Sequence, residues 1–132
     1  MKLVIILLVL FGIKHFLCDF LWQTPKMLAE KGTYGAIGGI AHAGAHALGT
    51  TIIFVLLLPW DPFAHLVAIL LGLLDGVMHY HIDWIKQHLN QGLTPADKMF
   101  WIWLGADQGL HYLTYILIIA IIVLWVQILT LI

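Results

Sequence analysis

Arginine is absent from this sequence, and charged residues of any kind are scarce. Six lysines and seven acidic residues give the 132-residue chain a formal net charge of -1, and charged residues make up 10% of it. An average soluble domain contains about 25%. Because no basic stripe is available to neutralise a phosphate backbone, we expect no nucleic-acid partner.

Cysteine is nearly absent as well, while apolar residues are abundant. Cys18 is the one cysteine, so no disulfide can form within the chain, and we expect it to pack as a small hydrophobe. Hydrophobic residues make up 62% of the chain, and the mean hydropathy is +0.99. This composition indicates an integral membrane protein surrounded by the lipid bilayer.

The N-terminal apolar run could be a secretory signal, but its length argues against that. It continues to Trp22 without a small-residue cleavage site, and it contains His15 and Asp19. We therefore interpret it as a retained membrane helix.

Four apolar segments are long enough to cross a bilayer, which takes about 20 residues. They cover residues 3–22, 36–58, 63–89 and 99–131. We predict an all-α polytopic membrane protein, a single domain over residues 1–132 folded as an up-down bundle of four transmembrane helices. The last segment exceeds the ~30 Å hydrocarbon core, so it must tilt, protrude or break, and Gly105 and Gly109 are the expected bend.

Glycine and alanine crowd the start of the second segment, between residues 36 and 49. Small residues let membrane helices approach closely, so this helix can lie at the centre of the bundle or form the contact in a homo-oligomer.

Most lysines fall in or near the loops at 23–35 and 90–97, namely Lys26, Lys31, Lys86 and Lys98. This bias predicts that those loops are cytoplasmic and that both termini are external.

Pairs of ionisable residues four positions apart recur in all four segments. The pairs are His15 with Asp19, His42 with His46, His79 with Asp83, and Asp107 with His111. Residues at this spacing share one helix face, and in an up-down bundle all four pairs fall at one depth, on the side richer in lysine. A single such pair often only forms hydrogen bonds between helices, whereas four at one depth indicate a shared site.

Five imidazoles and three carboxylates suit a dinuclear site for Zn, Fe or Mn, and we expect about two divalent ions per chain. Asp75 and Lys86 continue the column of His79 and Asp83. We predict catalytic roles for both: Asp75 would orient the ligands, and Lys86 would hold an anionic headgroup. Gln23, Asn90 and Gln108 are further candidates for orienting groups. The remaining histidines have no such partner and are interpreted as structural: His65, His81 and His88.

Three motifs carry a family resemblance. They are His15-Phe-Leu-Cys-Asp19-Phe20-Leu-Trp-Gln23, His79-Tyr-His-Ile-Asp83-Trp-Ile-Lys86 and Asp107-Gln108-Gly-Leu-His111. With them the chain resembles an uncharacterised family of small bacterial and phage integral membrane proteins. The resemblance implies a shared site and the bacterial inner (cytoplasmic) membrane, but no activity. A looser similarity to membrane-bound metal-dependent hydrolases rests on the His/Asp pairs alone.

These features favour a membrane-embedded metal-dependent hydrolase that acts on an anionic, lipid-like substrate. Three alternatives stay open: a di-iron-type membrane oxidoreductase, a metal-ion or proton transporter, and a structural membrane subunit. A transporter would need polar groups at both depths of the membrane, and the sequence concentrates them on one side.

Overall fold

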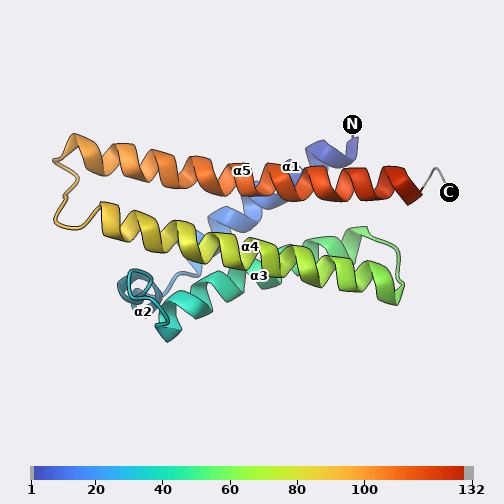
Figure 1. The fold of residues 1–132 in the computed structure, drawn as a ribbon, viewed down its shortest axis with the longest axis horizontal. Helices are drawn as coiled ribbons and strands as arrows, with labels where there is room; N and C mark the ends of the chain where they lie inside the picture. Colours follow the sequence, from blue (N-terminus) through green and yellow to red (C-terminus); the bar gives the residue numbers. More distant parts are fainter. Residues whose placement is uncertain (1, 130–132) are drawn as a thin grey trace.

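The fold is a bundle of four long helices in a computed structural model that describes residues 2–129 (Figure 1). The elements are α1 (Lys2–Phe16), the π-helical turn η1 (Leu17–Leu21), α2 (Pro25–Glu30), α3 (Ile37–Leu57), α4 (Pro62–Leu89) and α5 (Lys98–Leu129). Four stretches are long and apolar enough to cross a membrane: Lys2–Leu21, Ile37–Leu57, Pro62–Leu89 and Lys98–Ile128. The predicted all-α, four-span architecture is thus confirmed.

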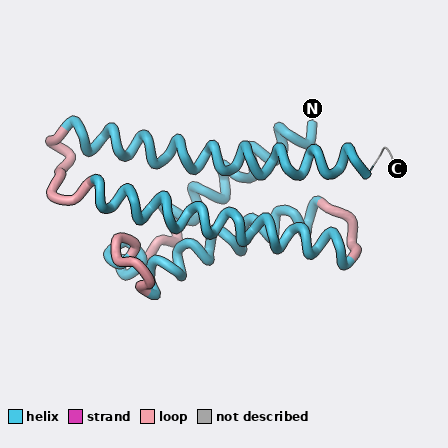
Figure 2. Tube along the Cα trace, in the orientation of Figure 1, coloured by secondary structure: helices cyan, strands magenta, loops and turns pink. Residues whose placement is uncertain are grey.

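The connections alternate between the two ends of the bundle (Figure 2). The turn between α3 and α4 lies near the N-terminus, whereas α2 and the loop between α4 and α5 lie at the other end (Figure 1). At the turn before α4, the Asp61 carboxylate accepts hydrogen bonds from the backbone N–H groups of Phe63 and Ala64, both at 3.0 Å. These bonds satisfy donors that a helix start leaves unpaired, and Pro62 occupies the first helical position.

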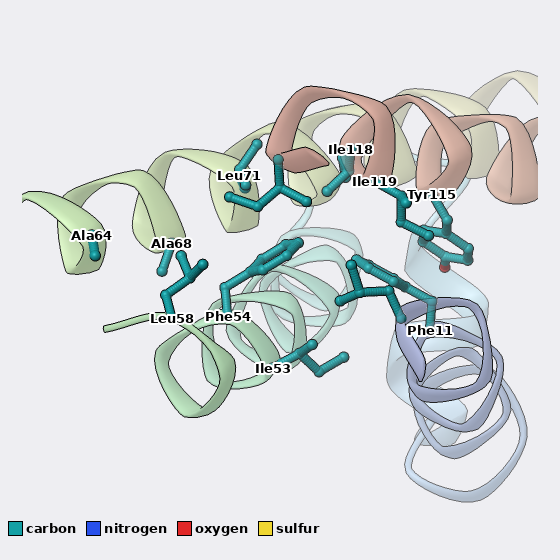
Figure 3. Packing of buried hydrophobic residues seen from close by; sticks show 12 residues of the cluster. Phe11, Ile53, Phe54, Leu58, Ala64, Ala68, Leu71, Tyr115, Ile118 and Ile119 are labelled. Atoms are coloured by element: carbon teal, nitrogen blue, oxygen red, sulfur yellow. The ribbon is translucent and has the colours of Figure 1, made fainter. Parts of the chain in front are cut away.

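Polar residues gather inside the bundle, and large apolar side chains cover its outside. Among the residues whose burial the structure describes, twelve polar or charged ones are buried, while leucine and isoleucine side chains are exposed on every long helix. An apolar layer formed by Leu7, Phe11, Phe54, Tyr115 and Ile118 fills the half of the bundle nearer the termini (Figure 3). This distribution is expected of a chain whose surroundings are lipid.

Helices α3 and α4 share the most extensive contact between described helices, and glycines of α4 permit it. A Cβ on Gly72 would lie 2.0 Å from Thr51 Oγ1 and 2.6 Å from the Ala47 carbonyl oxygen, and one on Gly76 would lie 2.9 Å from the Ala47 Cβ. Gly44 of α3 has no atom within 4 Å of such a Cβ. The small residues of α3 do serve close packing, but the glycines that the α3–α4 contact requires belong to α4.

Local structure differs from the prediction at three places. The predicted loop at 23–35 contains the short helix α2, which starts because the Thr24 hydroxyl accepts a hydrogen bond from the Met27 N–H at 3.2 Å and Pro25 occupies its first turn. The first membrane segment ends in the π-turn η1, where the Trp22 N–H donates to the Leu17 carbonyl at 2.9 Å. Finally, α5 continues through the glycines expected to bend it.

Candidate metal centre

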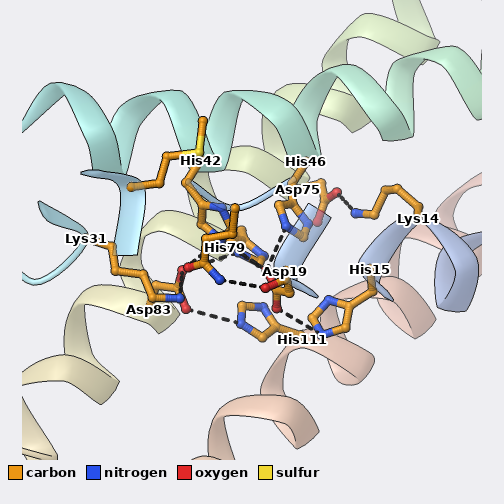
Figure 4. Close-up of polar contacts among 12 residues, drawn as sticks. Lys14, His15, Asp19, Lys31, His42, His46, Asp75, His79, Asp83 and His111 are labelled. Atoms are coloured by element: carbon orange, nitrogen blue, oxygen red, sulfur yellow. Dashed lines mark hydrogen bonds and ion pairs between the residues drawn. The ribbon is translucent and has the colours of Figure 1, made fainter. Parts of the chain in front are cut away.

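The four predicted pairs lie on α1, η1, α3, α4 and α5 and meet inside the bundle. Figure 4 shows how Asp19 and Asp83 lie among the imidazoles. Seven of the eight residues are buried, and the Asp19 side chain is 8% exposed. Asp19 belongs to the π-turn, a distortion that recurs at functional sites because it redirects a side chain.

One carboxylate oxygen of Asp19 lies close to three imidazole rings. Asp19 Oδ1 lies 3.0 Å from His46 Nε2, 3.1 Å from His42 Nε2 and 3.6 Å from His79 Nε2. The Nε2 atoms of His42 and His79 are 3.0 Å apart. Four ligands held about 2.0–2.1 Å from a tetrahedral ion are separated by about 3.3–3.4 Å, so this spacing fits the edges of one coordination sphere. These four residues could hold a metal ion.

Hydrogen bonding alone accounts poorly for this group. If the Nε2 atoms of both His42 and His79 donated to Asp19, two N–H groups would face each other across the 3.0 Å contact. A cation at the centre accommodates all four atoms. Nor do the other nitrogens of these rings fix their orientation, because Nδ1 of His42, His46 and His79 has no hydrogen-bond partner among the described residues.

A second group adjoins the first and shares His79. Asp83 Oδ2 lies 3.4 Å from His79 Nε2, and Asp83 Oδ1 lies 3.8 Å from His111 Nε2. Asp107 Oδ1 approaches the same His111 nitrogen at 3.5 Å. His79, Asp83 and His111 could hold a metal ion. Because one nitrogen lone pair binds one ion, His79 can complete either group but not both at once.

The remaining predicted ligand, His15, is engaged with other side chains. Its Nδ1 lies 2.8 Å from the Tyr115 hydroxyl, and its Nε2 lies 3.0 Å from Gln108 Oε1 and 3.2 Å from Asp19 Oδ2. His15 thus contacts Oδ2 of Asp19, whereas the imidazoles of His42, His46 and His79 face Oδ1. Gln23 donates to the main-chain oxygen of Asp19 at 2.6 Å, so it also positions this residue. Tyr115 was not among the predicted site residues, although its place four residues after His111 puts it on the same face of the helix.

Two buried lysines complete the site, and no sequence pattern assigned either of them to it. Lys14 Nζ donates to Asp75 Oδ2 at 2.5 Å, and the Thr50 hydroxyl donates to the same oxygen at 2.5 Å. Lys31 Nζ lies 3.2 Å from Asp83 Oδ2. The structure thus gives Asp75 a cationic partner, and the catalytic role predicted for Asp75 stays a prediction.

Lys86 lies at the edge of the site. It is half-buried and lines a small cavity of about 60 Å³ between α4 and α5, together with Trp103 and Asp107. Three other histidines lie outside both ligand groups. His81 and His88 each place Nδ1 2.8 Å from the carbonyl oxygen four residues earlier, and His65 packs against the Trp60 ring.

Comparison with known proteins adds a family but no activity. A family described as "Protein of unknown function (DUF3307)" matches residues 6–131. No curated protein and no solved structure shows significant similarity to the chain.

Proposed function

The chain belongs to this family of unknown function, and we propose that it is a membrane-embedded, metal-dependent hydrolase of anionic lipid-like substrates. The observation that carries the proposal is the convergence of Asp19, His42, His46 and His79 within the membrane-spanning bundle. Burying ionisable residues in a membrane is energetically costly, so those that are present usually serve a function. The side chains of this set are the ligands that zinc, iron and manganese prefer.

The two groups provide two cation positions of different character. The first offers four protein ligands, the number typical of a closed zinc site. With His79 assigned to the first position, Asp83, His111 and the adjacent Asp107 are left for the second, and a three-residue site keeps room for a substrate. A divalent ion bound to this centre would lower the pKa of a coordinated water and polarise a substrate oxygen, as hydrolysis requires.

The cavity between α4 and α5 suggests how a lipid could reach the site. Its apolar walls include Ile82, Ile85 and Leu110, and Asp107 lines it as well. Lys86 lines the same cavity, and its long stem lets the ammonium meet an anionic headgroup at the membrane interface. We therefore propose that the substrate enters laterally from the bilayer and that Lys86 binds its headgroup.

The lysine distribution supports an orientation for this reaction. Four lysines lie at the end of the bundle opposite the two termini (Figure 1). They belong to α2, to its C-cap, to the last turn of α4 and to the start of α5. We propose that this end is cytoplasmic, that the termini are external, and that the membrane is the bacterial inner membrane.

Transport and redox chemistry are the main competitors. The layer of Leu7, Phe11, Phe54, Tyr115 and Ile118 is buried and, apart from the Tyr115 hydroxyl that contacts His15, apolar. It separates the ligand groups from the end that carries the termini. A relay across the membrane would need polar groups in that layer, so the arrangement favours chemistry on one side. A di-iron oxidoreductase would use the same ligands, and the identity of the bound metal distinguishes it from a hydrolase.

The test combines metal analysis with lipid turnover. Protein purified in detergent, without chelators or a metal-binding tag, is analysed by mass spectrometry for metals and assayed on vesicles of phosphatidic acid, phosphatidylglycerol or phosphatidylcholine. We expect at least one divalent ion per chain and hydrolysis of the anionic lipids. Stable protein with a metal content near zero would contradict the proposal and favour a structural subunit.

A further inference from the structure

We propose that Lys31 supplies the second cation of the centre, so that the wild-type chain holds one divalent ion and one buried ammonium group. This inference rests on the proposed metal site. Lys31 is 6% exposed, and its Nζ lies 3.2 Å from Asp83 Oδ2. The same oxygen lies 3.2 Å from His42 Nε2 and 3.4 Å from His79 Nε2, so the ammonium sits where the two ligand groups join.

The contact between Lys31 and Asp83 is one of charge. Asp83 Oδ2 has no hydrogen-bond partner among the described residues, although the Lys31 nitrogen is 3.2 Å away. A positive charge at this distance is strongly attracted in a low-dielectric interior even without good hydrogen-bond geometry. Lys31 therefore neutralises Asp83 as a metal ion would, and it competes with an ion for this carboxylate.

Helix α2 delivers Lys31 to the site. Lys31 is the C-cap residue of α2, and this short helix docks on the start of α3 through two glycines. A Cβ on Gly38 would lie 2.7 Å from Glu30 Oε2, and one on Gly39 would lie 3.2 Å from the Lys31 Cα. The Gly38 N–H also donates to Glu30 Oε2 at 2.7 Å. This docking fixes the backbone beside the site, so the lysine points inward although it belongs to a segment between membrane helices.

The charge balance points to the same conclusion. The ligand groups contain the carboxylates of Asp19, Asp83 and Asp107, and Lys31 offsets one of them. The remaining two negative charges match a single divalent ion. A second ion beside Lys31 would leave the interior with two excess positive charges, and uncompensated buried charge is strongly unfavourable.

The experiment counts ions with and without the ammonium. Wild-type protein, Lys31→Met and Lys31→Gln are saturated with Zn²⁺ or Mn²⁺, passed through a desalting column and analysed by mass spectrometry. We expect about one ion in the wild type and about two in both variants, because Asp83 becomes free to bind metal. Lys26→Met is the matched control, since its exposed side chain also belongs to α2, and it should stay at one ion.

Each outcome has a distinct meaning. Two ions in the wild type, or one ion in the wild type and in both variants, would overturn the role of Lys31 and leave the metal site intact. No ion in any of the proteins would overturn the metal site itself. If Lys31→Met fails to fold, Lys31→Gln retains a polar side chain that can reach Asp83, and the wild-type count alone can still refute the inference.

Discussion

Removing one member of the buried Lys14–Asp75 pair should destabilise the bundle more than removing both. The two side chains are 5% and 1% exposed, and Asp75 Oδ2 accepts from both Lys14 and Thr50. Lys14→Met leaves an uncompensated buried carboxylate, and Asp75→Asn leaves an uncompensated ammonium. Breaking a buried pair in this way costs about 3–5 kcal/mol. The double variant contains neither charge, so it should recover about 1–3 kcal/mol of that loss.

The assay is a double-mutant cycle on unfolding in mixed detergent micelles, followed by tryptophan fluorescence. Metal content is measured on the same preparations. We expect positive coupling between Lys14 and Asp75 and an unchanged metal content in the double variant, because neither residue belongs to the ligand groups. Additive single effects would refute the interpretation of the pair as mutual compensation. A stable double variant that keeps its metal but lacks turnover would support the catalytic role predicted for Asp75.

Three further predictions concern the packing, the ligands and the substrate. Gly72→Ala should cost about 1–3 kcal/mol in the same unfolding assay because its Cβ meets Thr51, whereas Gly44→Ala, which faces open space, should be neutral or stabilising by up to about 1 kcal/mol; equal effects would refute the close contact. His46→Ala should lose metal and His65→Ala should retain it, as measured by mass spectrometry; identical behaviour would contradict the assigned ligand group. Lys86→Met should keep its metal and lower turnover of anionic lipid about fivefold, the effect of about 1 kcal/mol per lysine near a charged surface, while unchanged turnover would make Lys86 a membrane anchor.

Hydropathy and four-residue spacing predicted the membrane spans and the meeting of the pairs because both are local properties of the chain. A span is defined by about 20 apolar residues, and the spacing of His79 and Asp83 places both on one face wherever the helix lies. The common depth of the pairs followed from the alternating direction of consecutive helices. No tertiary information was needed for these steps.

Local sequence patterns did not predict which side chains of different helices would contact one another. Lys14 precedes His15 and points to Asp75 of another helix, and no local pattern specifies that rotation. Lys31 belongs to a loop by composition, and its insertion depends on the docking of α2 onto Gly38. The π-turn that carries Asp19 is also invisible to a rule that assumes 3.6 residues per turn.

The X-ray absorption spectrum of the purified protein at the edge of its bound metal tests the central claim most directly. We predict nitrogen and oxygen neighbours at about 2.0–2.2 Å, outer-shell scattering from several imidazoles, and no sulfur ligand. In His46→Ala the imidazole scattering should fall. A spectrum with a sulfur neighbour, or one without imidazole scattering and unchanged by His46→Ala, would show that the metal binds elsewhere and would contradict the assignment of this centre.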